Sequence, residues 1–154
     1  MRTKSTYLAG IIAGLIAGAI MSVAMMAYMA SVGMSVWTNP NLVAVMWLGA
    51  EVAGPGFSGA TILGFITHMA MSALMGLIAV PFILALSPWR TVAISIFYAT
   101  ASYPIVFTLV ITWANPMMFE TSDTVPMTLA HVLFGVVLGS AYLRLSPEIT
   151  PNRR

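Results

Sequence analysis

Four long apolar stretches divide the chain, and short, more polar stretches separate them. A helix needs about 20 apolar residues to cross the roughly 30 Å hydrocarbon core of a bilayer. The stretches at 7–32, 58–86, 90–113 and 125–145 meet that length. They lack the period-two alternation of strands, and a backbone in lipid must satisfy its own hydrogen bonds, so each is predicted to be a helix. The pattern predicts an all-α integral membrane protein with four transmembrane helices in a single domain, 1–154.

A shorter apolar segment lies between the first two predicted spans. Asn39 is a residue type that caps helices, and Pro40 suits the first helical turn. The segment 40–48 is too short to span, so we predict an outer interfacial helix anchored by Trp37 and Trp47. The same reasoning places helix caps at Ser58 and at Asp123 or Thr124.

The two halves of the chain share a design. Trp-Thr-Asn-Pro at 37–40 follows the first span, and Trp-Ala-Asn-Pro at 113–116 follows the third. The second and fourth spans each hold one histidine and each end in Leu-Ser-Pro. This repeat predicts an up-down bundle of two similar hairpins, related by a pseudo-twofold axis along the membrane normal.

Composition agrees with a membrane protein and narrows the function classes. Charged residues make up 6% of the chain and hydrophobic residues 60%, with a mean hydropathy of +0.96, whereas soluble domains carry about 25% charged residues. The net charge of +2 rests on few residues, so no nucleic-acid partner is predicted. The chain has no cysteine, which excludes disulfides and thiolate sites. The first apolar run is longer than a signal-peptide core of about 7–15 residues, so we expect it to be retained.

Charge placement predicts the orientation. In the four-span topology every Lys and Arg falls on one side of the membrane, namely Arg2, Lys4, Arg90, Arg144, Arg153 and Arg154. Glu51, Glu120 and Asp123 fall in the opposite loops, and Glu148 lies with the cations. Because cationic loops stay in the cytoplasm, both termini are predicted to be cytoplasmic, in the inner or plasma membrane.

Two histidines inside the apolar spans are the main candidates for chemistry. His68 and His131 are predicted within roughly 6 Å of the same depth, in the outer half of the bilayer. Small residues recur on the same helix faces, at Gly64, Gly76, Gly135 and Gly139. One hypothesis is a bis-histidine haem b between the second and fourth helices, with the glycines making room for the porphyrin. No Lys or Arg is available on that side for the propionates.

Other interpretations of the histidines stay open. Each imidazole could instead hydrogen-bond across a helix interface, as polar residues in membrane bundles do. Copper or a proton path is a third possibility, since thioethers favour Cu(I) and helical spacing puts Met71 and Met75 on the face of His68. The 13 methionines could also be adaptable packing surface.

The first helix carries a pattern of small residues. Gly10, Gly14 and Gly18 recur at every fourth position and predict a tight helix crossing. Met21, Met25 and Met29 continue at the same interval. Because three of the four helices carry small-residue stripes, we expect at least one stripe to meet another polypeptide. The leading functional hypothesis is therefore an accessory subunit of a larger, energy-transducing membrane complex, with other subunits and lipids as partners. The haem-bearing electron-transport subunit is the alternative.

The third span is the most polar, and it suggests a third hypothesis. A kink at Pro104 would free a backbone carbonyl that could serve a permeation path, as in a small transporter or channel. Its polar residues are Tyr98, Thr100, Ser102, Tyr103 and Thr108. No nucleophile–base pair or paired carboxylate occurs in the spans, so no catalysis by the chain itself is expected.

The predicted orientation is tested by cysteine labelling in a chain that has no native cysteine. Ser5→Cys and Asn152→Cys should be protected from an impermeant thiol reagent applied outside the cell, whereas Ser122→Cys should react. The measurement is labelling in intact cells and again after permeabilisation. The reverse pattern would overturn the orientation.

Overall fold

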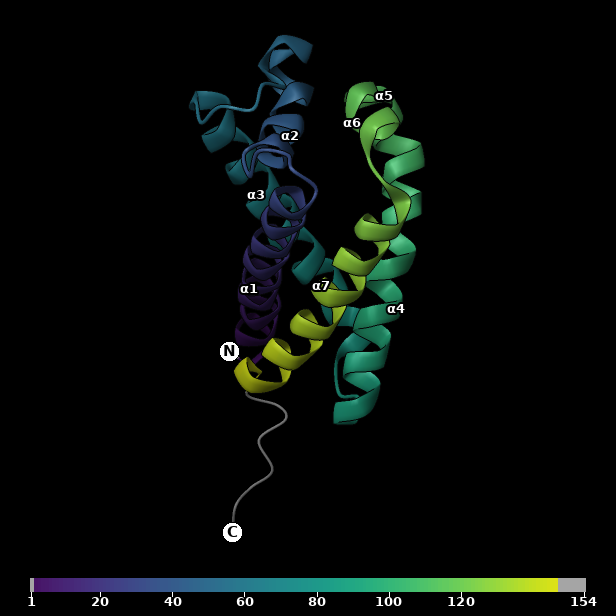
Figure 1. The fold of residues 1–154 in the computed structure, drawn as a ribbon. Coiled ribbons are helices and arrows are strands. Elements are labelled where there is room, and N and C mark those ends of the chain that lie inside the picture. The colour runs from purple at the N-terminus through teal and green to yellow at the C-terminus, as the bar shows by residue number, and fades with distance from the viewer. Residues whose placement is uncertain (1, 147–154) are drawn as a thin grey trace.

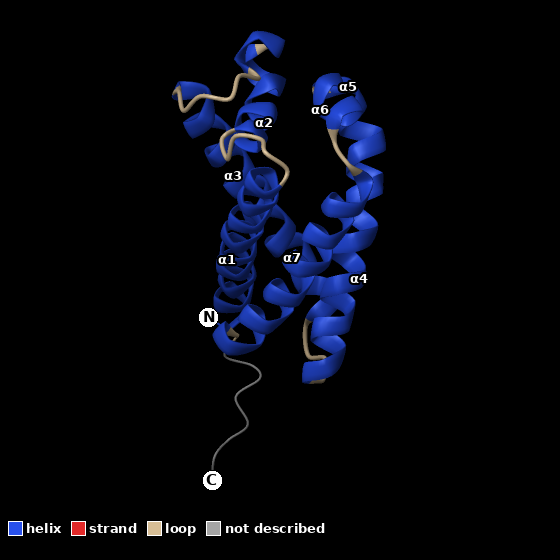
Figure 2. Cartoon of the chain, in the orientation of Figure 1, coloured by secondary structure: helices blue, strands red, loops and turns tan. Residues whose placement is uncertain are grey.

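The computed structural model describes residues 2–146, with side chains from residue 5 onward, and within this range every regular element is helical (Figures 1 and 2). The long helices are α1 (Arg2–Ser31), α3 (Gly59–Ile83), α4 (Pro88–Val106) and α7 (Thr124–Leu145). Four segments are long and apolar enough to cross a membrane: Ser5–Ser31, Gly59–Ile83, Pro88–Ala114 and Thr124–Leu145. They agree with the predicted spans to within a few residues, which confirms the prediction of an all-helical, multi-pass membrane protein.

Short helices gather at the end of the molecule opposite the N-terminus (Figure 1). They are α2 (Thr38–Leu48), the 3₁₀ turn η1 (Ala50–Val52), the π-helical segment η2 (Phe107–Ile111), α5 (Thr112–Ala114) and α6 (Pro116–Thr121). Glu51, Glu120 and Asp123 belong to these short elements and their loops, so we call this the acidic end. Arg90, in the first turn of α4, and Arg144, in the last turn of α7, belong to the opposite end, where the N-terminus also lies. Arg153, Arg154, Glu148 and the side chains of Arg2 and Lys4 lie outside the described residues.

Two of the helix ends follow the sequence signals closely. α1 ends in a Schellman motif, because Gly33 has a φ of 77°, its N–H donates to Ala30 O at 3.1 Å, and Met34 N–H donates to Met29 O at 2.9 Å. At the start of α3, Ser58 accepts a hydrogen bond from Ala60 N–H at 3.2 Å. The predicted Ser58 cap is therefore confirmed.

One predicted cap is wrong, and another has the predicted position without a cap hydrogen bond. α2 begins at Thr38, before Asn39, and its N-cap is Trp37, which makes no side-chain cap bond. Asn39 therefore lies inside the helix. Asp123 occupies the N-cap position of α7 but makes no cap bond, because its carboxylate instead accepts a hydrogen bond from Tyr28 Oη at 3.0 Å. A tertiary contact has replaced the local one. The helix α2 packs along α3, and its place at a membrane surface stays a prediction.

The long helices pack as an open series in the order α3, α1, α7, α4. α1 packs along both α3 and α7, and α7 also packs along α4, whereas α3 and α4 have few contacts. A pseudo-twofold relating the hairpins would make the α3–α4 contact equivalent to the α1–α7 contact. The structure therefore does not confirm the predicted symmetry.

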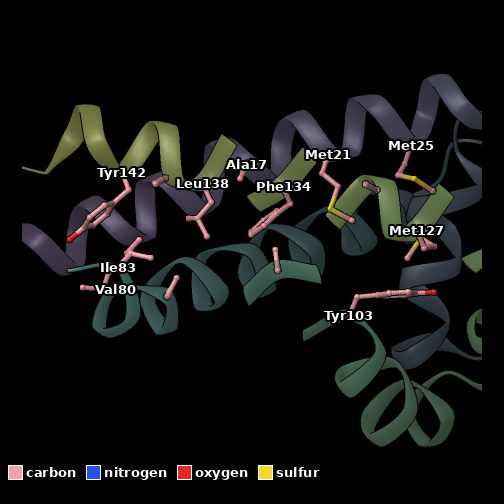
Figure 3. Close-up of a cluster of buried hydrophobic side chains, with 14 of the residues drawn as sticks. Ala17, Met21, Met25, Val80, Ile83, Tyr103, Met127, Phe134, Leu138 and Tyr142 are labelled. Carbon is pink, nitrogen blue, oxygen red and sulfur yellow. The ribbon is translucent and has the colours of Figure 1, made fainter. Parts of the chain in front are cut away.

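α1 is the central helix because two of its faces carry small residues. Its glycine face meets α3: a Cβ at Gly14 would lie 2.9 Å from Gly76 Cα and would also strike the Ser72 carbonyl. A second face is formed by alanines, of which Ala13 and Ala17 have no exposed surface. Ala17 lies beside side chains of α7 in the buried cluster (Figure 3). Both faces allow close backbone approach, so α1 joins the two hairpins.

Helix α4, which begins the third span, is followed within that span by a π-helical turn. Pro104 lies inside α4, and the next turn is the π-helical segment η2. Proline removes one backbone donor and crowds the preceding turn, and a π-turn is one way in which a helix accommodates such a defect. The predicted irregularity at Pro104 thus takes the form of a π-turn, and its residues Phe107, Val110 and Ile111 line a cavity.

Replacement of Gly14 by leucine tests the central crossing. The added side chain would overpack the contact with Ser72 and Gly76, so unfolding free energy should fall by about 1–3 kcal/mol. Thermal unfolding in mild detergent measures the effect. Gly59→Leu is the matched control, because Gly59 begins α3 and has open space around it. Equal stability of the two variants would contradict the close α1–α3 approach.

Candidate functional site

A cavity of about 220 Å³ lies between α1, α3, η2 and α7, beneath α2 and Asn115. Both histidines line it, so the structure brings together the two candidate residues from opposite halves of the chain. Methionine is the most frequent residue type in its lining, with Met21, Met46, Met71, Met75, Met118 and Met127. We call this the inner cavity.

His68 is fixed by the central helix crossing. Its Nε2 lies 3.1 Å from Gly18 O on α1. A carbonyl accepts but does not donate, so Nε2 carries the hydrogen, and in the neutral ring Nδ1 keeps its lone pair. Only glycine fits at position 18, because Ser72, one turn after His68, occupies the space where a Cβ would be. The glycine face of α1 therefore brings the acceptor within reach of the imidazole.

His131 is fixed within its own helix. Its Nδ1 lies 2.8 Å from Met127 O, one turn earlier in α7, so Nδ1 is the donor and Nε2 keeps its lone pair in the neutral ring. The ring of Tyr103 packs against the imidazole, with the centroids 4.8 Å apart and an interplanar angle of 33°. A histidine whose one nitrogen donates to a carbonyl has its tautomer and its ring orientation set, as in metal sites.

Two hydroxyl groups beside the imidazoles are tied to their own helices. Ser72 Oγ donates to His68 O at 2.8 Å, and Ser102 Oγ donates to Ala99 O at 2.9 Å. Both donate their hydrogens to backbone rather than toward the cavity. These hydroxyl groups therefore offer no O–H to a ligand in the inner cavity, where the two imidazoles and the six thioethers are the nitrogen and sulfur donors.

Asn115 closes the inner cavity at the acidic end. It is 1% exposed, its Nδ2 donates to Leu42 O at 2.6 Å, and its Oδ1 accepts from Met118 N–H at 3.0 Å. The first bond joins α2 to the start of α6, across the two halves of the chain. The second caps α6 and holds Met118 against the cavity.

Asn41 performs a similar task in the first half. This asparagine is 1% exposed, and its Nδ2 donates to Gly54 O at 2.6 Å and to Gly56 O at 2.9 Å. Thr61 Oγ1 donates to Asn41 Oδ1 at 2.6 Å. Together these bonds fasten the loop before α3 to α2. The buried asparagine of the second half, Asn115, is thus part of its Trp-x-Asn-Pro motif. The buried asparagine of the first half, Asn41, follows its motif by one residue.

A second cavity, of about 280 Å³, lies nearer the acidic end between α1, α2 and α7. It is lined by Met25, Met29, Met34 and Met127, together with Tyr28 and Asp123, whose side chains are hydrogen-bonded to each other. Met34 and Asp123 are exposed, so this cavity opens to the surface, and we call it the outer cavity.

Met127 is the residue that lines both cavities, and it is 6% exposed. Its side chain lies with those of Met21 and Met25 in the space between α1 and α7, and Tyr103 lies across from it (Figure 3). Nine of the twelve methionines with described side chains line one cavity or the other. The methionines are therefore concentrated around the cavities rather than spread through the protein–lipid surface.

The four glycines proposed to make room for a porphyrin face neighbouring helices instead. A Cβ at Gly64 would strike the backbone of Pro40, and one at Gly76 would lie 2.8 Å from Gly14 Cα. Gly135 and Gly139 approach the backbone of α4 in the same way. Helix packing therefore fills the space over all four glycines.

The glycines of α1 also pack within the chain. Gly10, Gly14 and Gly18 all face α3, at Gly76, Val80 and Ser72. The expectation that this stripe meets another polypeptide therefore loses its basis.

Sequence reasoning missed several lining residues. The sequence pattern did not single out Met46, Met118 or Met127, and it marked Asn115 only as part of the repeat. For Asn115, the repeated Trp-x-Asn-Pro motif was the signal that could have indicated its role.

No protein-family model, no curated protein and no solved structure matches the chain. Within the described residues there is also no group of three or more His, Asp or Glu side chains able to hold a metal ion. A metal bound by the two imidazoles would therefore take its remaining donors from thioethers or from a ligand.

The asparagine closure is tested by replacing Asn115 with leucine. Met118 N–H and Leu42 O would lose their partner in a buried site, and each unsatisfied group costs about 1–3 kcal/mol. We expect a clear drop in the thermal midpoint in detergent. Asn39→Leu, at the equivalent motif position but without a cap hydrogen bond from its side chain, should change stability much less. Similar losses in both variants would contradict the special role of Asn115.

Proposed function

We propose that this chain is a multi-pass protein of the cell membrane that binds a metal centre between His68 and His131. One observation carries the proposal. The two imidazoles each use one nitrogen on a backbone carbonyl, and both line the same apolar cavity. Imidazoles with a fixed tautomer and a free lone pair are ready metal ligands.

The proposed orientation puts this site in the outer half of the membrane. The described cations Arg90 and Arg144 lie at the end that holds the N-terminus, and the acids lie at the other end. Under the positive-inside rule the acidic end faces outward and both termini are cytoplasmic. The outer cavity then opens toward the outside of the cell.

Haem b and a metal ion without a porphyrin are two candidates for the metal centre. Both candidates use the same imidazole nitrogens. Haem is less well supported, because helix packing fills the space over Gly64, Gly76, Gly135 and Gly139, and because Arg90 and Arg144 lie far from the acidic end. Haem propionates need cationic or polar partners. The methionine lining instead favours a soft metal ion.

Internal duplication and partner subunits are further proposals. The placement of one histidine from each half in one cavity supports duplication of an ancestral hairpin, although the α3–α4 contact is weak. A role as an accessory subunit of a larger, energy-transducing complex no longer rests on the glycine stripes. Crosslinking in native membranes followed by gentle extraction tests it, and a chain that runs as a monodisperse monomer without partners would contradict it.

The metal-centre proposal is tested with variants that keep each carbonyl hydrogen bond but remove the ligand. His68→Gln can place an amide N–H near the Nε2 position, and His131→Asn can do so near Nδ1. Wild-type protein purified in mild detergent should retain a stoichiometric metal, measured by elemental analysis and a visible spectrum. Both variants should lose it while keeping the wild-type helical content.

The matched controls are Asn39→Gln and Thr100→Ser, which leave the inner cavity lining unchanged. They should retain the metal. If wild-type protein reconstituted with haem, Cu(I) or Zn(II) holds none of them, or holds them equally well in both histidine variants, the proposed function is wrong.

A further inference from the structure

We propose that the metal is monovalent copper, and that it reaches the histidines through the methionines of the outer cavity. This inference rests on the proposed function and specifies its ligand. It starts from the lining of the inner cavity, in which two imidazoles and six thioethers outnumber the four hydroxyl side chains, Thr67, Ser72, Ser102 and Tyr103. Thioethers are soft donors that favour Cu(I), whereas Mg²⁺ and Ca²⁺ require oxygen ligands.

The charge of the site also favours a monovalent ion. The described residues that line the inner cavity include no carboxylate and no thiolate. A bound ion therefore keeps its full charge in apolar surroundings, and the cost of removing an ion from water rises with the square of its charge. With neutral ligands, the electrostatic cost of moving Cu(I) from water into the cavity is about a quarter of the cost for a divalent ion of the same size.

The first ligands beside His68 come from its own helix. Met71 and Met75 are three and seven residues after His68, and both line the inner cavity. On the opposite side Met127 is four residues before His131, and its carbonyl orients that imidazole. His68 thus has two methionines on its own helix at the inner cavity, and His131 has one.

The outer cavity provides the route. Met34 and Met29 line it near the surface, and Met25 lies deeper, one turn from Met21 of the inner cavity. Met127 separates the two cavities, and a methionine side chain has enough rotatable bonds to swing between them. Thioethers spaced in this way let a soft ion exchange ligands step by step.

The charge at the surface opening of the outer cavity also suits a cation. The exposed carboxylate of Asp123 lines the outer cavity and would attract a cation from water. The inner cavity also reaches the surface at Met71 and Val110, which are 44% and 46% exposed. That side faces lipid in the proposed topology, and an ion does not readily cross hydrocarbon. The outer cavity is therefore the entry.

The experiment measures Cu(I) binding by the full chain in anaerobic detergent solution, in competition with a chromophoric Cu(I) chelator. Met71→Leu/Met75→Leu removes two inner thioethers at nearly constant volume. Loss of residues that merely support a metal ligand costs roughly 10- to 100-fold in affinity, so loss of these ligands should weaken Cu(I) binding at least about tenfold. Met69→Leu/Met117→Leu is the control, because neither residue lines the inner or outer cavity, and its affinity should match wild type.

The route is tested by stopped-flow loading of Cu(I) into proteoliposomes whose acidic end faces outward. Met29→Leu/Met34→Leu should slow loading while leaving the equilibrium affinity at the wild-type value. Met127→Leu should slow both loading and release. Wild-type rates in both variants would overturn the route.

The outcomes separate this inference from the proposed function. If Cu(I) binding depends on His68 and His131 but not on Met71 and Met75, the thioether site is wrong while the histidine site stands. If the histidines bind haem or Zn(II) but not Cu(I), copper is wrong and the metal-centre proposal stands. If none of these probes binds in a histidine-dependent way, both are wrong.

Discussion

The close approach of α1 to α3 is the contact on which the rest of the structure depends. It is made possible by glycines whose missing side chains leave room for the opposite backbone, as at Gly14 against Gly76. Because lipid offers no hydrophobic drive for helices to associate, such packing supplies much of the association energy in a membrane. The adjacent alanine face then lets α7 approach α1 from another side, and α4 follows α7. One small-residue helix thus organises the other three.

The same approach creates the setting of the candidate site. Gly18 is the last glycine of the α1 stripe, and its carbonyl accepts the hydrogen bond that orients His68. Since the series of helices stays open between α3 and α4, these helices diverge around a space that the methionines line. Asn115 then closes this space at the acidic end by joining α2 to α6. The cavity therefore follows from strong packing on one side of α1 and weak packing between α3 and α4.

The sequence predicted the spans well because span length and hydropathy are local properties. It also singled out His68 and His131, and it predicted the tight crossing at Gly10, Gly14 and Gly18. The sequence could not specify which helix packs against each face of α1. The methionines at 21, 25 and 29 continue the alanine face, four residues after Ala17, rather than the glycine face. The cap hydrogen bond expected from Asp123 is missing for a related reason, because its carboxylate has a tertiary partner, Tyr28, that no local signal encodes.

The position of the histidines gives a bound metal a mechanical role as well as a chemical one. His68 belongs to α3 and His131 to α7, and these two helices have little direct contact in the described part of the chain. A metal ion held by both imidazoles would join the hairpins by linking α3 to α7 across the inner cavity. Any ligand that binds the folded state alone stabilises it in proportion to the logarithm of its concentration over its Kd. The gain would fall between α3 and α7, which have little direct contact, and not on the α1–α3 and α1–α7 contacts, which are already close. Binding would therefore tie α3 and α7 together across the cavity, while both stay packed on α1.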